Sequence, residues 1–301
     1  MIAYPGTYGG AASFDALARA LVLRGATSGN HTEVWAIDRR SNLLEDLRGM
    51  STAQASANAE IAAGYYFGGE TIGGTAFPGF RTQESVAFMS EWGLATLIED
   101  LRNVVEVVPQ ASRKGHVFVM GHSAGGGVAE TYAGWHFDDD ALQGSEELAG
   151  VVLVDGASPG TAISETDYHA GFGTSFFASP GVDEIRSTTR YSALPLLGVG
   201  VFAESEILAL RALLAPSDVV RDSQRDTFLS LLFSVTARQV PHMTNRAAFG
   251  LGFDDASNGI PVFSASLGAR GSSAPSSKPE WRPSSAGYLA HWSKTELEGS
   301  S

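Results

Sequence analysis

The 301-residue chain contains no cysteine, which excludes a thiol nucleophile, disulfide bonds and thiolate metal sites. Basic residues are scarce: 20 Lys and Arg stand against 33 Asp and Glu, giving a net charge of −13. Such a chain lacks the positive field that nucleic-acid binding requires, so we expect no nucleic-acid partner. With 44% hydrophobic and only 18% charged residues, the chain is nevertheless too apolar to be disordered.

Long hydrophobic runs are also missing. No segment approaches the roughly 18 apolar residues of a membrane-spanning helix, so no membrane span is expected. The segment Met1–Gly10 has no basic region and does not resemble a signal peptide, which favours a cytoplasmic location. The run Asp138–Asp140 is not followed by Gly and Glu at the spacing of a calcium loop. We therefore interpret this run as a solvated acidic loop. We expect neither a metal nor a cofactor.

Helical and strand patterns alternate in the first half of the chain. Helical periodicity gives apolar stripes within Phe14–Val22 and Leu94–Val108, which we expect to be buried. Short apolar runs typical of strands occur at Glu33–Ile37, Val117–Met120 and Val151–Val154. Continuous apolar strands separated by helices predict an α/β fold with a mostly parallel sheet covered on both faces.

The pattern changes after residue 157. Helical periodicity dominates the next hundred residues, as in Ile207–Leu214, and a strand-like run returns only at Pro261–Ser264. We therefore predict a core whose first part is 1–157, a helical cap insertion at 158–258, and the last part of the core at 259–301.

The segment Gly121-His122-Ser123-Ala124-Gly125 matches the pattern G-x-S-x-G. An apolar strand leads directly into it and a small-residue helix, about Ala124–Trp135, leads out of it. This is the strand–turn–helix setting of a nucleophile elbow, in which a sharp turn exposes the serine hydroxyl. So sharp a turn strains the serine and crowds its neighbours, which accounts for glycine at both ends of the pattern.

On these residues the chain resembles the α/β-hydrolase superfamily. The resemblance rests on Val117–Gly127, Pro5–Gly10, Asp38-Arg39-Arg40 and Val151–Asp155, and it covers about residues 4–155 well. It implies that Ser123 is the nucleophile and that the backbone amides of Thr7 and Ala124 form the oxyanion hole. Only four residues precede Pro5, so the first strands of a full sheet are expected to be missing, as in a trimmed variant or a fragment.

The resemblance also implies the order nucleophile, acid, histidine along the chain. The late strand Pro261–Ser264 has no acid in the segment after it, whereas Asp155 follows the strand Val151–Val154, 32 residues after Ser123. We therefore take Asp155 as the acid, with Asp254 and Asp255 in reserve. The alternative is that Asp155 only caps a turn, since Asp-Gly-Ala-Ser is a good turn sequence.

Seven histidines compete for the role of base, and only His291 lies after the late strand, where the order requires it. His242, within the predicted cap, is the second candidate. The alternative for His291 is an exposed surface histidine near the chain end.

Two neighbouring arginines, Arg39 and Arg40, are expected to pair with Glu45 and Asp46 on this acidic chain. The function that these residues favour is a serine hydrolase that cleaves small-molecule carboxylic esters through an acyl-enzyme. A non-catalytic binding protein that keeps the hydrolase scaffold is the alternative, and an acyl-transfer enzyme is a third possibility. The sequence gives no prediction of oligomeric state.

Overall fold

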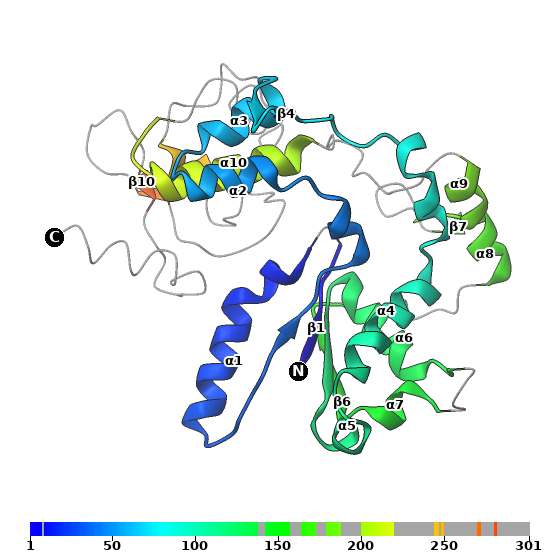
Figure 1. Cartoon of the computed structure of the whole chain (residues 1–301). Coiled ribbons are helices and arrows are strands. Elements are labelled where there is room, and N and C mark those ends of the chain that lie inside the picture. The colour runs from blue at the N-terminus through cyan, green and yellow to red at the C-terminus, as the bar shows by residue number, and fades with distance from the viewer. Residues whose placement is uncertain are drawn as a thin grey trace. The chain divides into compact units, whose positions relative to one another are not determined.

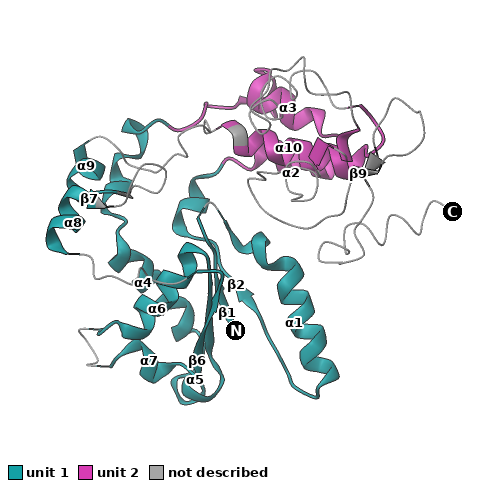
Figure 2. Cartoon of the chain, turned by 180° about the vertical axis from the view of Figure 1, so that it is seen from behind, with its two compact units in different colours: residues 1–45, 82–192 teal, residues 46–81, 193–301 magenta. Residues whose placement is uncertain are grey.

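The structure is a computed structural model, and it describes residues 1–7, 9–137, 142–156, 164–172, 179–187, 200–219, 244–246, 248–249, 270–271 and 280–281. The chain divides into two compact units, coloured separately in Figure 2. Unit 1 comprises Met1–Glu45 and Thr82–Ser192, and unit 2 comprises Asp46–Arg81 and Ala193–Ser301.

Unit 1 alternates strands and helices. In chain order its elements are β1 (Ile2–Tyr4), the 3-10 helix η1 (Ala11–Phe14), α1 (Asp15–Thr27), β2 (Trp35–Ala36), the 3-10 helices η2 (Arg40–Leu44) and η3 (Glu84–Glu91), α4 (Leu94–Glu106), α5 (Gln110–His116), β5 (Phe118–His122), α6 (Ala124–Gly134), α7 (Gly144–Glu147), β6 (Gly150–Val154), α8 (Glu165–Ala170), β7 (Gly171–Phe172), β8 (Ser179–Pro180) and α9 (Val182–Ser187).

Four strands of unit 1 form one sheet in the order β2-β1-β5-β6, and all three pairings are parallel. Figure 1 shows α1 on one side of this sheet and α4 and α6 on the other. This arrangement confirms the predicted α/β class and the parallel sheet flanked by helices. The chain runs from β1 outward to β2 and from β5 outward to β6, so the strand order reverses between β1 and β5.

Successive strand residues point to opposite faces, which separates the core of unit 1 into two layers. The larger cluster joins the sheet to α4 and α6, and its members include Ile2, Tyr4, Val119, Ile98, Leu101, Ala129 and Tyr132. The intervening residues Ala3 and Met120 face the other side and pack with Phe14 of η1. Both faces of the central strands β1 and β5 are therefore buried.

The apolar stripe predicted for the first helix is not buried. The helix forms as α1, but none of its residues is buried, and Leu17 and Val22 are 38% and 41% exposed. Only Phe14, in η1 just before α1, is in the core. The prediction was wrong because periodicity determines which face of a helix is apolar, not whether other elements cover that face.

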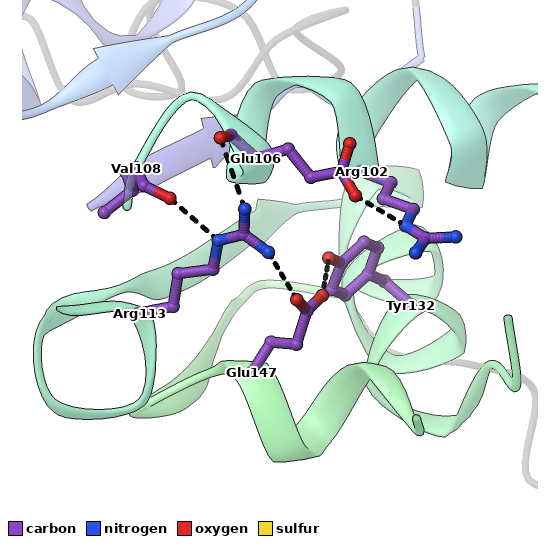
Figure 3. Close-up of polar contacts among 6 residues, drawn as sticks. All are labelled: Arg102, Glu106, Val108, Arg113, Tyr132 and Glu147. Atoms are coloured by element: carbon purple, nitrogen blue, oxygen red, sulfur yellow. Dashed lines mark hydrogen bonds and ion pairs between the residues drawn. The ribbon is translucent and has the colours of Figure 1, made fainter. Parts of the chain in front are cut away.

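A buried polar network lies at the amino ends of β5 and β6 (Figure 3). Arg113 of α5 donates to the backbone carbonyls of Val108 and Glu106, at 2.8 and 3.2 Å, and forms an ion pair with Glu147 of α7. The Glu147 carboxylate also accepts a hydrogen bond from the Tyr132 hydroxyl at 3.3 Å. Burial raises the pKa of the Tyr132 phenol, and the neighbouring Glu147 carboxylate raises it further. The network joins α4, α5, α6 and α7 at the amino ends of these strands.

Replacing Glu147 with Ala is expected to lower the free energy of unfolding by about 3–5 kcal/mol, because it leaves a buried guanidinium without its counter-charge. The side chains of Arg113 and Glu147 are only 11% and 7% exposed. Urea unfolding followed by tryptophan fluorescence measures the change. Glu146→Ala is the matched control, since the neighbouring Glu146 is exposed and bonds only the Gln143 amide. Equal stability losses in the two variants would show that the network does not stabilise the fold.

Unit 2 contains α2 (Arg48–Ala55), α3 (Glu60–Phe67), the strand pairs β3 (Thr71–Ile72) with β4 (Thr75–Ala76) and β9 (Arg270–Gly271) with β10 (Glu280–Trp281), and α10 (Gly200–Leu214). The helix predicted over Ile207–Leu214 is part of α10. Arg211 of α10 is buried and donates to both carboxylate oxygens of Glu60 at 2.7 and 2.8 Å, which ties α10 to α3.

The predicted boundaries 1–157, 158–258 and 259–301 do not coincide with the two units, since residues 46–81 group with the later part of the chain. The boundaries of the cap and the strand at Pro261–Ser264, which lies outside the described residues, stay predictions. Within the described part of the chain, no helix is long and apolar enough to cross a membrane.

Candidate active site

The candidate site lies at the carboxyl edge of the sheet. The register pairs Tyr4 of β1 with Gly121 of β5, and His122 of β5 with Val154 of β6. Continued past the strand ends, this register sets Gly6, Ser123 and Asp155 at one level on three neighbouring strands. The strand order reverses between β1 and β5, and in open α/β sheets ligands bind at such a switch point.

Ser123 adopts a backbone conformation that is rare for a residue with a side chain, with φ 53° and ψ −124°. Its N–H donates to the Val154 carbonyl at 3.0 Å, and its own carbonyl accepts from the Gly126 N–H at 2.9 Å. These bonds hold the serine between the end of β6 and the first turn of α6. A strained residue held by its surroundings is a feature that clusters at functional sites.

The elbow leaves no room for side chains at either glycine of the motif. A Cβ on Gly121 would lie 2.0 Å from the Gly125 carbonyl oxygen, and one on Gly125 would lie 2.5 Å from that of Tyr4. Helix α6 therefore begins in direct backbone contact with the end of β1. This close approach sets the sharpness of the turn at Ser123.

The loop after β1 lies against the serine. A Cβ on Gly6 would be 2.8 Å from the Ser123 Cβ and 3.2 Å from Nδ1 of His122. Thr7 follows Gly6 and is exposed, and Ala124, also exposed, follows Ser123 as the first residue of α6. The first N–H groups of a helix have no intrahelical acceptor. The two amides expected to form the oxyanion hole thus belong to the residues next to the contact between Gly6 and Ser123.

Asp155 also has a left-handed backbone, with φ 47°. Among the described residues other than glycine, only Ala57, Ser123 and Asp155 have a positive φ, so two of the three lie at neighbouring strand ends. The next residue, Gly156, packs on the serine: its Cβ would lie 2.0 Å from the Ser123 carbonyl oxygen. The Asp155 side chain is exposed. Asp tolerates a left-handed φ better than most residues, so this conformation suits both the catalytic role and the turn role.

Both candidates for the base, His291 and His242, lie outside the described residues, as do the reserve acids Asp254 and Asp255. Two described histidines have partners elsewhere: His116 bonds the Ser112 carbonyl at 3.0 Å, and His169 lies 3.3 Å from the Asp183 carboxylate. No hydrogen bond joins the Ser123 hydroxyl to a side chain in the described part of the chain. The assignment of the base to His291 stays a prediction.

The arginines after β2 do not form the predicted pairs. Arg40 pairs with Asp100 of α4 and lies over the Trp92 ring. Arg39 Nη2 donates to the carbonyl oxygens of Gly6 and Gly9, at 2.8 and 2.9 Å. The predicted partners have other contacts, since Glu45 accepts from Asn42 and Asp46 accepts from Tyr65.

The sequence alone does not indicate these contacts of Arg39, because an arginine on an acidic chain suggests a nearby opposite charge. The informative feature is the position of Arg39 shortly after β2, the strand that pairs with β1. In β1, burial raises the pKa of the Tyr4 phenol to about 12, against the opposing effect of the Arg39 charge. The phenol is therefore neutral at physiological pH.

No family model, curated protein or solved structure matches this chain. The resemblance to the α/β hydrolases therefore rests on the residues of the chain itself. In the described ranges, no group of three or more His, Asp and Glu side chains is arranged to hold a metal ion.

Proposed function

We propose that the protein is a serine hydrolase that cleaves carboxylic esters through a covalent acyl-enzyme. The observation that carries the proposal is the backbone of Ser123, strained at φ 53° in a strand–turn–helix elbow at the switch point of a parallel sheet. A serine held in this way presents its hydroxyl at the sheet edge, where a substrate carbonyl can reach it.

In the proposed reaction the Ser123 oxygen attacks the ester carbonyl carbon while His291 takes the hydroxyl proton. Asp155 holds the imidazole in the tautomer that can accept this proton. The negative charge on the tetrahedral oxygen is stabilised by the N–H groups of Thr7 and Ala124, each contributing about 3–4 kcal/mol to the transition state. The intermediate collapses with departure of the alcohol, which takes the proton from the imidazole, and water then hydrolyses the acyl-enzyme.

Two measurements on the full chain test the proposal. Hydrolysis of p-nitrophenyl esters of increasing acyl length should follow saturation kinetics, and a fluorophosphonate should form one adduct per chain, located at Ser123 by peptide mass spectrometry. A binding protein that keeps only the scaffold should do neither. A chain that neither turns over any ester nor labels at Ser123 contradicts the hydrolase assignment and favours the binding protein.

The base has its own test, in the variants His291→Ala and His242→Ala. We expect His291→Ala to lower kcat by about 10⁵- to 10⁶-fold, since a triad base is needed to the same extent as its nucleophile. His242→Ala should change kcat by less than about threefold relative to the wild type. A change this small corresponds to less than the 1.4 kcal/mol that alters a rate tenfold. The reverse result assigns the base to His242. Full activity in both variants refutes both candidates.

A further inference from the structure

Arg39 lies at the same sheet level as the candidate site. The register pairs Ile2 with Trp35 and Ala3 with Ala36, so its continuation past the ends of β1 and β2 sets Gly6 beside Arg39. The hydrogen bonds agree with this position: Nη2 of Arg39 bridges the carbonyl oxygens of Gly6 and Gly9 at 2.8 and 2.9 Å. The Gly6 oxygen also accepts from the Gly9 N–H at 3.1 Å, which closes a turn around Thr7.

These contacts fix the direction of one particular amide. The Gly6 carbonyl and the Thr7 N–H belong to the same peptide group, which is planar, and no peptide bond in the described residues is cis. In a trans peptide the C=O and N–H bonds point in opposite directions. The two hydrogen bonds to the Gly6 oxygen therefore aim the Thr7 N–H away from Arg39.

The far end of the loop is held by the neighbour of Arg39. The Asp38 carboxylate accepts the Ala11 N–H at 2.7 Å, and a Cβ on Gly10 would lie 2.6 Å from the same oxygen. The Nε of Arg39 is buried and has no acceptor within the described part of the chain. The Nε–H group of Arg39 therefore loses its hydrogen bond to water on folding, which costs free energy. Its Nη2 nevertheless bridges the two carbonyls.

We infer that Arg39 is a positioning residue that aims the Thr7 N–H at the substrate oxyanion, with Asp38 holding the other end of the same loop. This inference rests on the proposed function. It explains why Arg39 binds backbone carbonyls on a chain that offers many carboxylates. Lys would be a poorer substitute, because its ammonium is a compact, strongly hydrated charge on a flexible stem and lacks the planar geometry of guanidinium.

The kinetic test uses Arg39→Met in the full chain, with p-nitrophenyl butyrate as substrate. We expect kcat to fall about 10²-fold, the lower end of the effect of losing one oxyanion donor, with KM changed by less than about threefold. The kcat of Arg39→Lys should be roughly tenfold higher than that of Arg39→Met, since lysine restores a charged donor in the same place. The matched control is Arg40→Met, the adjacent arginine that pairs with Asp100 and does not touch the loop.

A double-mutant cycle separates positioning from a general structural role. Thr7→Pro removes the amide hydrogen itself, and proline is well tolerated at the second position of a turn. If Arg39 acts through the Thr7 N–H, the double variant Arg39→Met/Thr7→Pro should be no slower than Thr7→Pro alone. Fully multiplicative losses would show that Arg39 acts by another route and would overturn the inference.

Hydrogen exchange gives a readout independent of activity. Arg39→Met should speed exchange of the Gly9 amide more than tenfold, because its acceptor is no longer held, and leave the strand β5 unchanged. Unchanged exchange at Gly9 would show that Arg39 does not hold the Gly6 carbonyl in place, and would refute the inference.

A wild-type chain that neither hydrolyses esters nor reacts with the fluorophosphonate overturns the proposed function and this inference together. An active wild type whose Arg39→Met and Arg39→Lys variants keep full kcat overturns this inference alone.

Discussion

Replacing Ser123 with Ala should abolish ester hydrolysis while leaving the fold intact. We expect kcat to fall by about 10⁶-fold, as when the nucleophile of a triad is removed, and fluorophosphonate labelling to disappear. The thermal midpoint should change by less than about 2 °C, because Ala and Ser both carry a Cβ and have a similar steric cost at a positive φ, and because the bonds to Val154 and Gly126 come from the main chain. Ser51→Ala, at an exposed serine of α2, is the matched control.

The same position allows a measurement of the strain. Ser123→Gly should be as inactive as Ser123→Ala. Its free energy of unfolding should exceed that of Ser123→Ala by about 1–3 kcal/mol, because glycine adopts a positive φ without steric strain. Retained turnover in either variant would show that Ser123 is not the nucleophile. Loss of folding in both would show that the hydroxyl is structural.

Local patterns predicted three of the four strands of the sheet of unit 1 and the helices α1, α4 and α6. The helix expected over Leu94–Val108 forms as α4 at Leu94–Glu106, followed by Pro109, and the strand expected at Val151–Val154 forms as β6 at Gly150–Val154. Such elements are encoded by periodicity and stop signals within a few residues. Strand β1, at Ile2–Tyr4, gave no comparable signal because three residues are too few to show a period.

The elbow was predictable for a related reason. Gly121 is required by a contact within five residues, since a Cβ there would collide with the Gly125 carbonyl. Gly125 is required by the carbonyls of Tyr4 and Pro5, so only the sequence pattern indicates it in advance. The bridge from Arg39 to Gly6 was not predictable in this way, because it joins residues 33 apart and depends on the register of β1 with β2. An arginine in an acidic sequence suggests a carboxylate partner, and only the fold brings the backbone carbonyls of Gly6 and Gly9 within its reach.

The base shows where chain order stops being informative. Chain order selects His291 because it follows the late strand, whereas no local pattern sets it near Ser123. A histidine that must return to a sheet edge depends on the path of the whole intervening chain. Mutation of each candidate histidine is therefore the more direct route to the assignment.

Replacing Asp155 with Asn separates the two roles that its position allows. Asn tolerates a left-handed φ as well as Asp does and has nearly the same shape, so the turn before Gly156 should survive. The thermal midpoint should therefore change by less than about 2 °C, a shift worth at most about 1 kcal/mol in a domain of this size. The negative charge is lost and one acceptor oxygen becomes an NH2 donor, so the group that selects the correct imidazole tautomer is gone.

If Asp155 orients the base, Asp155→Asn should lower kcat about 10⁴-fold, the loss caused by the wrong tautomer in serine proteases. The substitution Asp183→Asn, at an exposed aspartate beside His169, is the matched control and should leave kcat unchanged. An Asp155→Asn variant with full activity leaves the residue with its turn role alone. The same loss in Asp254→Asn or Asp255→Asn, with Asp155→Asn active, moves the acid to the later segment. The charge of Asp155, and not the shape of its turn, is thus the property on which the proposed triad depends.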